Sequence, residues 1–248
     1  MDGGEDHGEA SPGAVIGDRY VLEELIGRGG MADVYRARDR HLDRTVAVKV
    51  FRPGGEPEGA RRLVAEARLL APLDHPGVVA LSDGGVDEYR PFLVMPLVTG
   101  GTLADRLVSG PLPVPEVTRL GRGLAGALAY LHGHGIVHRD VKPSNVLLDE
   151  DGRPLLGDFD VSRFVGSTRL TSTGEIIGTA AYLAPEQVRG LGAGPAADVY
   201  ALGLMLLECL TGHPVYAGTD QISIATARLL REPDVPGELP AELRAVLA

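Results

Sequence analysis

Cysteine and tryptophan are scarce in this chain. Its 248 residues include no tryptophan and a single cysteine, Cys209. One cysteine cannot form an internal disulfide, which excludes a small disulfide-stabilised fold and fits the reducing environment of the cytoplasm. Cys209 lies in an apolar stretch of helical character, so we expect a buried, unreactive thiol; a reactive thiol is the alternative.

Basic residues are also in deficit. There are 24 Lys and Arg residues against 34 Asp and Glu residues, which gives a formal net charge of −10. Such a surface repels nucleic acids and anionic membranes, so we exclude both as main partners. The apolar fraction of 44% and the charged fraction of 23% are ordinary for a globular protein with a sizeable core.

Long apolar runs and a signal peptide are missing as well. A membrane-spanning helix needs about 18 to 20 apolar residues, and the longest apolar stretch here, residues 199–210, is interrupted by Glu208. We predict a buried helix at this place. The first residues are acidic and rich in glycine, unlike a signal peptide. We predict that residues 1–17 form a disordered acidic leader.

The pattern of apolar residues changes near residue 100. Short β-type runs dominate before it and helical patterns dominate after it. The expected strands are residues 20–26, 33–37, 45–51, 78–82 and 91–95, and one helix is expected at residues 58–71. The later expected helices are residues 115–134, 195–211, 220–231 and 241–248. This order predicts an α+β fold with two lobes, residues 18–95 and 101–248, joined by a hinge at residues 96–100. Clefts between lobes commonly bind ligands.

Two motifs in the first lobe are weak when each is taken alone. Residues 27–34 (GRGGMADV) are glycine-rich and lie between two expected strands. Glycine lets the backbone approach a phosphate closely, but a plain hairpin turn is the simpler interpretation. Lys49 lies within an apolar strand, where its charge needs an acceptor. Glu66 on the expected helix could be that acceptor, or it could be a solvated helix residue.

A third motif, residues 138–145 (HRDVKPSN), is strong by itself. It brings an acid, a cation and an amide into one short loop. Asp140 can accept a hydroxyl proton, Lys142 can offset charge on a transferred phosphoryl group, and Asn145 can coordinate a metal. The fourth motif is residues 158–160 (DFD), in which Asp158 offers a hard oxygen ligand of the kind that Mg²⁺ prefers. The fifth motif is the tripeptide at residues 184–186 (APE).

These five motifs, in this order, resemble the protein kinase family. The segments GRGGMADVYRA, HRDVKPSNVLL and GTAAYLAPEQ resemble the eukaryotic-like (Hanks-type) serine/threonine protein kinases of bacteria. The resemblance extends from Tyr20 to the end of the chain. It implies the two-lobe kinase fold, with a five-stranded antiparallel sheet and one helix in the N-lobe and a mainly helical C-lobe. It also implies ATP-dependent phosphorylation of protein hydroxyls in signalling.

The resemblance assigns a role to each motif residue. The phosphates of ATP are contacted by Gly27, Gly29, Gly30 and Lys49, and Lys49 pairs with Glu66. Asp140 is the catalytic base and Lys142 contacts the γ-phosphate. The metal, Mg²⁺ or Mn²⁺, is held by Asn145 and Asp158. Such catalysis is mainly positioning and charge stabilisation.

The adenine site follows from the same resemblance. The residues above and below the base are Val34, Ala47 and Leu147, and Met95 is the gatekeeper. Pro96 has no N–H donor, but its position needs only a carbonyl acceptor. The donor comes from Val98.

The loop between Asp158 and Glu186 carries the expected regulation. Lys142 and Thr179 resemble the serine/threonine branch rather than the tyrosine branch, and the resemblance assigns Thr179 to the loop that receives polypeptide substrates. Thr171 and Thr173 align with positions that this branch autophosphorylates. Arg139 is the natural cationic partner for a phosphate there.

Two departures from the family pattern affect the expected activity. Ala32 replaces the third glycine of the phosphate loop, and we expect little effect from its methyl group. Asp160 stands where the family has glycine, which leaves a pseudokinase or nucleotide-binding scaffold as the alternative function.

The remaining expectations concern zinc, partners and the extent of the protein. His132, His134 and His138 lie close in sequence, but structural support of the catalytic loop by His138 is preferred over a zinc site. We expect the C-lobe to be truncated and the chain to be a fragment of a longer protein. Related kinases can carry a membrane span or a sensor beyond the region that ends here at residue 248. They can also form homodimers through the N-lobe. ATP and proteins with Ser or Thr are the expected partners, and the kinase domain is expected in the cytoplasm.

Overall fold

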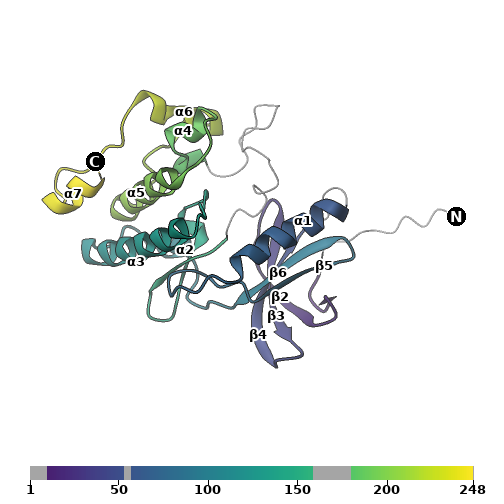
Figure 1. Cartoon of the computed structure of the whole chain (residues 1–248). Helices are drawn as coiled ribbons and strands as arrows, with labels where there is room; N and C mark the ends of the chain where they lie inside the picture. The colour runs from purple at the N-terminus through teal and green to yellow at the C-terminus, as the bar shows by residue number, and fades with distance from the viewer. Residues whose placement is uncertain (1–9, 53–56, 159–179, 248) are drawn as a thin grey trace. The chain divides into compact units, whose positions relative to one another are not determined.

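The computed structural model of the chain describes residues 10–52, 57–158 and 180–247 (Figure 1). The chain divides into two compact units. The first comprises residues 1–74 and 80–97, and the second comprises residues 75–79 and 98–248.

The first unit is built on an antiparallel sheet of six strands, in the order β1-β2-β3-β4-β6-β5. The strands are β1 (Val15–Ile16), β2 (Tyr20–Arg28), β3 (Ala32–Asp39), β4 (Arg44–Phe51), β5 (Asp83–Asp87) and β6 (Arg90–Pro96). Helix α1 (Pro57–Ala67) continues into the 3₁₀ turn η1 (Arg68–Leu70). Figure 1 shows α1 beside β5 and β6, the two strands against which it packs.

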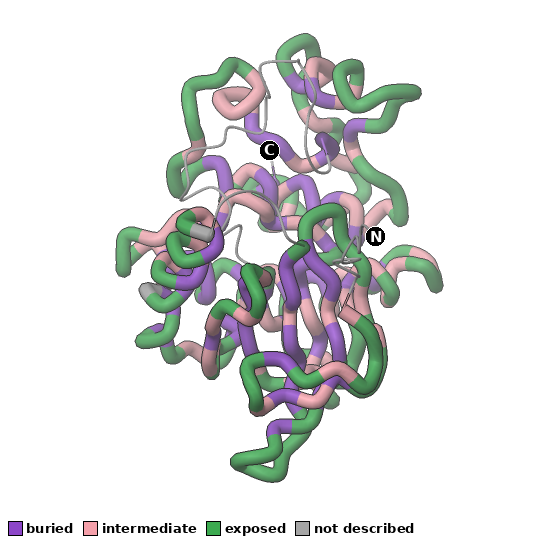
Figure 2. Tube along the Cα trace, turned by 90° about the vertical axis from the view of Figure 1, so that its right-hand side faces the viewer, coloured by how far each residue is buried: buried purple, intermediate pink, exposed green. Residues whose placement is uncertain are grey.

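Alternation of apolar and polar residues along the strands produces the core of this unit. One face of the sheet buries a cluster that includes Tyr35, Val48 and Val94, visible as buried stretches along the strands in Figure 2. The rings of Tyr20 and Phe92 pack edge to face, with centroids 5.9 Å apart. Such aromatic pairs add about 0.5–1.5 kcal/mol beyond the burial of their surface.

The expected strand at residues 78–82 is wrong. The fifth strand is Asp83–Asp87, whose sequence DGGVD has a low β propensity. Val78 and Val79 are instead used in the second unit, where the Val79 N–H donates to the Leu156 carbonyl at 2.9 Å. The apolar signal was therefore real, but it marks pairing with Leu156 rather than a strand of the large sheet.

The predicted disorder of residues 1–17 is also wrong for the end of that segment. Val15–Ile16 form β1 against Tyr20 and Val21, and Ile16 is buried. The Tyr35 hydroxyl donates to the Ala10 carbonyl. Two adjacent β-branched residues explain this sixth strand. Residues 1–9 lie outside the described part of the chain.

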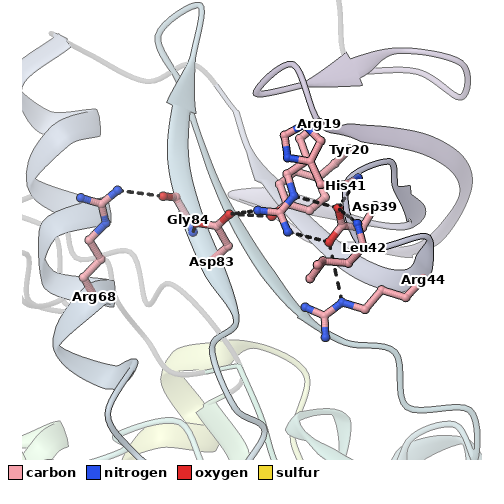
Figure 3. Close-up of polar contacts among 9 residues, drawn as sticks. All are labelled: Arg19, Tyr20, Asp39, His41, Leu42, Arg44, Arg68, Asp83 and Gly84. Atoms are coloured by element: carbon pink, nitrogen blue, oxygen red, sulfur yellow. Dashed lines mark hydrogen bonds and ion pairs between the residues drawn. The ribbon is translucent and has the colours of Figure 1, made fainter.

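A buried carboxylate at the end of β3 organises the polar contacts of this part of the sheet (Figure 3). Asp39 has no exposed surface. Its two oxygens accept from Arg19 Nε and Nη2 at 2.7 and 2.8 Å, and its Oδ1 accepts from the N–H groups of His41 and Leu42. The hydrogen bonds from Arg19, above all, lower the pKa of Asp39 to about 2.

The same network reaches β5. Arg19 Nη1 lies 3.2 Å from Asp83 Oδ2, and the Tyr20 hydroxyl donates to the same oxygen at 2.6 Å. On the other side of this strand, Arg68 donates to the Gly84 carbonyl at 3.2 Å. Figure 3 shows these contacts in one row, from η1 to the turn after β3. They connect η1, the edge strand β5, the start of β2 and the turn after β3.

The second unit is mainly helical. Its helices are α2 (Leu103–Leu107), α3 (Val114–Gly133), α4 (Pro185–Val188), α5 (Pro195–Thr211), α6 (Gln221–Leu230) and α7 (Ala241–Leu247). Its 3₁₀ turns are η2 (Pro143–Asn145) and η4 (Ala180–Tyr182), and its small antiparallel sheet consists of β7 (Val146–Leu148) and β8 (Pro154–Leu156).

Helix α5 is the buried centre of this unit and packs against α3. Its bounds match the predicted helix at residues 195–211, and it ends at Gly212, which has a φ of 81° that glycine adopts without strain. Cys209 is fully buried, as predicted, and burial raises the pKa of its thiol to about 12. Within the described residues, no helix has both the length and the apolar character that a membrane span requires.

We predict that Asp39→Asn lowers the free energy of unfolding by about 2–4 kcal/mol, because a neutral amide removes the fully buried charge that binds two nitrogens of Arg19 and leaves Arg19 paired with the more exposed Asp83. Since the Asp39 pKa is depressed, its stabilisation is complete above about pH 4 and is lost as the pH falls toward about 2. Urea titrations across this range should show the two proteins converging. Asp43→Asn, at an exposed carboxylate, is the matched control. An equal loss in both variants would contradict the prediction.

Candidate active site

The loop of residues 138–145 is anchored by a carboxylate that lies far away in the sequence. Asp198, in the first turn of α5, is 1% exposed. Its Oδ2 accepts from the His138 N–H at 2.8 Å and its Oδ1 accepts from the Arg139 N–H at 2.7 Å. His132 Nε2 lies 2.8 Å from Oδ2. Three elements of the second unit therefore meet on one buried charge.

Arg139 adopts a backbone conformation that favours the contact with Asp198. Its φ is 68°, a left-handed conformation that costs a non-glycine residue about 1–2 kcal/mol. Two successive N–H groups with such a turn between them point toward a common anion. The Asp198 carboxylate supplies that anion, so the strain at Arg139 is offset by two charge-assisted hydrogen bonds.

The His138 ring connects the loop to the segment before Asp158. Its Nδ1 accepts from the Asp140 N–H at 3.3 Å, and its Nε2 lies 2.9 Å from the Gly157 carbonyl oxygen. Since Nδ1 accepts, Nε2 carries the hydrogen and donates it to Gly157. This confirms the predicted supporting role of His138. No cluster of three or more potential metal-ligating His, Cys, Asp or Glu side chains occurs in the described ranges.

The Asp140 carboxylate is oriented by two neighbours on the same loop. Its Oδ2 lies 2.9 Å from Lys142 Nζ and accepts from Asn145 Nδ2 at 2.9 Å. Asn145 Nδ2 also donates to the Asp140 main-chain carbonyl at 2.9 Å. The predicted acid, cation and amide are thus in direct contact. With Nδ2 engaged twice on Asp140, the Asn145 amide presents its carbonyl oxygen elsewhere.

The small sheet brings Asn145 and Asp158 to neighbouring positions. Val146 pairs with Leu156, and the Gly157 N–H donates to the Asn145 carbonyl at 2.9 Å. Asp158, the next residue, is exposed and has a φ of 55°. A side-chain carbonyl and a carboxylate at adjacent ends of two paired strands fit the oxygen ligands of Mg²⁺.

The glycine-rich segment forms the connection between β2 and β3. Gly27 pairs with Val34, and the Gly29 N–H donates to the Ala32 carbonyl at 2.9 Å. A Cβ built on Gly30 would meet no described atom within 4 Å, so the space beside its Cα is open, while its carbonyl accepts from Arg52 Nη1 at 3.2 Å. Ala32 lies in β3, buried and paired with Phe51. The methyl group of Ala32 therefore packs in the interior of this unit, and its small effect on activity stays a prediction.

Lys49 and Glu66 lie in the same unit, on β4 and α1. Lys49 pairs with Leu93 of β6, the strand that contacts α1, and its Nζ lies 5.4 Å from the centre of the Phe51 ring. Glu66 Oε2 is buried and accepts no hydrogen bond from the described residues. The ion pair between these two residues stays a prediction.

The predicted adenine-contacting residues are divided between the units. The first unit holds Val34, Ala47, Met95 and Pro96, and the second holds Val98 and Leu147. Ala47 pairs directly with Met95 across β4 and β6. Leu147 lies in β7 and forms an isolated antiparallel bridge with Thr102.

Several predicted residues lie outside the described part of the chain. These are Asp160, Thr171, Thr173 and Thr179. Their assigned roles stay predictions.

The sequence interpretation missed the two acids of α5. Besides Asp198, Glu208 accepts a hydrogen bond from the Tyr182 hydroxyl of η4, and burial raises the pKa of the Glu208 carboxyl. A charged residue within an apolar helix is a signal in itself, because a buried charge requires a partner. In the sequence, Glu208 stands out only as an interruption of an apolar run.

The protein kinase domain family matches residues 20–238. Among curated relatives, serine/threonine-protein kinase PknL of Mycobacterium tuberculosis is 46% identical over 226 residues, which cover 90% of this chain. PrkC of Bacillus subtilis is 40% identical over 89% of this chain, and PknB of Mycobacterium leprae is 39% identical over 90%. The aligned regions cover 56%, 34% and 37% of PknL, PrkC and PknB, so this chain spans about half or less of these relatives.

We predict that Asp198→Asn lowers the free energy of unfolding by about 2–4 kcal/mol, because the His138 and Arg139 N–H groups bind different oxygens of Asp198 and an asparagine amide is neutral and has one oxygen. Hydrogen exchange of residues 136–145 should accelerate more than that of α3. Asp151→Asn, at an exposed carboxylate, should change stability by less than about 0.5 kcal/mol. Unchanged exchange in the loop of Asp198→Asn would show that this carboxylate does not anchor it.

Proposed function

Because the chain belongs to the protein kinase family and carries a serine/threonine kinase domain of the bacterial Hanks type, we propose that it transfers the γ-phosphoryl group of ATP to Ser and Thr hydroxyls of proteins. The observation that carries this proposal is the contact of Asp140 with Lys142 and Asn145 on the anchored loop. Acid, cation and amide are already assembled there.

In the proposed reaction, Asp140 orients the substrate hydroxyl and accepts its proton. The hydrogen bond from Asn145 and the ammonium group of Lys142 hold the carboxylate in one orientation, so less reorganisation is needed when the hydroxyl attacks. Lys142 also offsets negative charge on the transferred phosphoryl group. Positioning and charge stabilisation of this kind account for most of the catalysis in phosphoryl transfer.

Asn145 and Asp158 would hold the metal, Mg²⁺ or Mn²⁺. Their oxygen donors and their placement at adjacent ends of β7 and β8 support this assignment. A bound divalent ion neutralises charge on the phosphate oxygens. Lys49 and the glycine-rich segment are assigned to the ATP phosphates, where the open space beside the Gly30 Cα suits the close approach of a ligand.

A catalytically inactive scaffold is the alternative raised by Asp160. This residue lies outside the described part of the chain, and no comparison favours the alternative, because the relatives carry kinase names. We therefore propose an active kinase rather than an inactive scaffold.

The partners of the proposed kinase follow from its chemistry and from the family resemblance. ATP and proteins with accessible Ser or Thr are the substrates. A location in the cytoplasm, a homodimer through the N-lobe and a membrane or sensor segment in a longer protein stay predictions from the resemblance.

We predict that the purified chain with Mg-ATP phosphorylates a generic basic protein such as myelin basic protein. Asp140→Asn should reduce the rate by at least about 100-fold, because a general base contributes roughly 10²–10⁴-fold. Radiolabel transfer measures the rate, and Asp151→Asn should match the wild type. Intact nucleotide binding without any transfer by the wild type would favour the scaffold.

We also predict autophosphorylation at one or both of Thr171 and Thr173. A phosphate adds about −1.5 to −2 charge at neutral pH, and the Arg139 guanidinium can donate hydrogen bonds to its oxygens. Phosphopeptide mapping after incubation with ATP should find the modification in the wild type and not in Asp140→Asn. Two unmodified threonines in an active sample would contradict this.

A further inference from the structure

Arg228 is a buried cation with no carboxylate beside it in the part of the chain that the structure describes. It lies near the end of α6 and is 6% exposed. A buried guanidinium without an anion is costly unless its donors are satisfied by other groups. Burial lowers the pKa of this side chain. Other hydrogen-bond acceptors must therefore bind the Arg228 guanidinium, and the identity of these acceptors indicates its role.

Main-chain carbonyls are those acceptors. Arg228 donates from Nε to Ala225 and from Nη2 to Ile224 of its own helix, both at 2.9 Å. These two bonds fix the plane of the guanidinium. Its remaining donors reach η4 and the residue after it: Nη2 donates to Ala180 at 2.6 Å and Nη1 donates to Leu183. The fork of Arg228 thus spans one turn of main chain.

A second side chain of α6 holds the same turn. Gln221, one residue after the helix cap and seven before Arg228, accepts from the Ala180 N–H at 3.0 Å through Oε1. Side chains of α6 therefore hydrogen-bond both the main-chain N–H and the main-chain carbonyl of Ala180. Ala180, Leu183 and Ala225 pack together in a small buried cluster separate from the main core. The helix and the turn form one unit of packing and hydrogen bonding.

The turn has little support of its own. Its internal hydrogen bond, from the Leu183 N–H to the Ala180 carbonyl, is long at 3.4 Å. Tyr182 adds a bond to Glu208 of α5. Without α6, buried carbonyls at Ala180 and Leu183 would lose their strongest donor. The shape of this segment thus depends on Arg228.

We propose that Arg228, assisted by Gln221, is a positioning residue for the protein substrate of the kinase. This inference rests on the proposed function and on the family resemblance, which assigns Thr179, directly before Ala180, to the loop that receives polypeptide substrates. Arg228 holds the following turn in the shape that the substrate backbone meets. It touches neither ATP nor the reacting hydroxyl, so its effect falls on protein binding rather than on the chemical step.

The chemistry of the side chain explains why arginine is needed here. A planar fork can serve two carbonyls of one turn and two of its own helix at once. Lysine keeps the charge but has no such planar fork with fixed spacing. Methionine fills the space and leaves both carbonyls of the turn without their donor. Lysine should therefore restore part of what methionine loses.

The test compares Arg228→Met, Arg228→Lys and Gln221→Ala by steady-state kinetics with myelin basic protein and Mg-ATP. For Arg228→Met we expect the KM for the protein to rise about tenfold, as for the loss of one charge-assisted hydrogen bond. The KM for ATP should stay within about twofold. Arg228→Lys should recover part of the loss, and Gln221→Ala should show a smaller rise. Gln221 is exposed, so this variant decides the matter if Arg228→Met does not fold.

The matched control is Arg231→Met. Arg231 lies over the same Tyr216 ring as Arg228, at 4.8 Å against 4.7 Å from the ring centre, but it donates to Val215 rather than to η4. For Arg231→Met, the KM for the protein and the KM for ATP should both stay within about twofold of the wild type, because a surface substitution has a small effect.

Hydrogen exchange of residues 180–188 gives a readout that needs no activity. It should accelerate in Arg228→Met while residues 136–145 exchange as in the wild type. Equal KM values in all variants of an active enzyme would overturn this inference alone. So would a joint fall of kcat with a rise in the KM for ATP, which marks a general loss of structure. A wild type that transfers no phosphate would overturn the proposed function and, with it, the substrate role.

Discussion

The candidate site depends on the hydrogen bonds that the buried carboxylate of Asp198 accepts from the catalytic loop. It lies on the central helix of the second unit and accepts two successive main-chain N–H groups from the loop that carries Asp140. A charge this deeply buried is stable only when its hydrogen bonds are complete. The loop is therefore held by the helix, and the conformation of Arg139 follows from that bond. His138 then passes the constraint on to Gly157, next to the proposed metal ligand Asp158.

Each segment of the second unit that carries a proposed role is held through its main chain. Asp198 binds N–H groups of the catalytic loop, Arg228 binds carbonyls of the turn after Thr179, and the ring of His138 binds one group of each kind. Main-chain contacts fix the path of a loop and leave its side chains available for chemistry. The first unit uses the same device at Asp39, which accepts N–H groups of a turn while it neutralises Arg19.

Much of the fold was predictable from local patterns. The helix at residues 195–211 and the strand at residues 45–51 have strong periodicity, and the structure confirms them within one residue. The strand Asp83–Asp87 was not predictable, because its residues have low β propensity and only pairing with β6 makes it a strand. The contact of Asp140 with Asn145 was implied by their closeness in the chain. The anchor Asp198, about 60 positions away, becomes apparent only from the fold.

Asp198 and Glu208 lie ten residues apart on one unbroken helix. At 1.5 Å per residue, this places their attachment points about 15 Å apart along its axis. One end of the helix sets the position of the catalytic loop, and the other end sets the position of η4 through Tyr182. The length of the helix between the two acids therefore fixes the distance between the catalytic loop and η4. An insertion of even one residue between the two acids would turn one of them by about 100°, so this stretch can change in composition during evolution far more readily than in length.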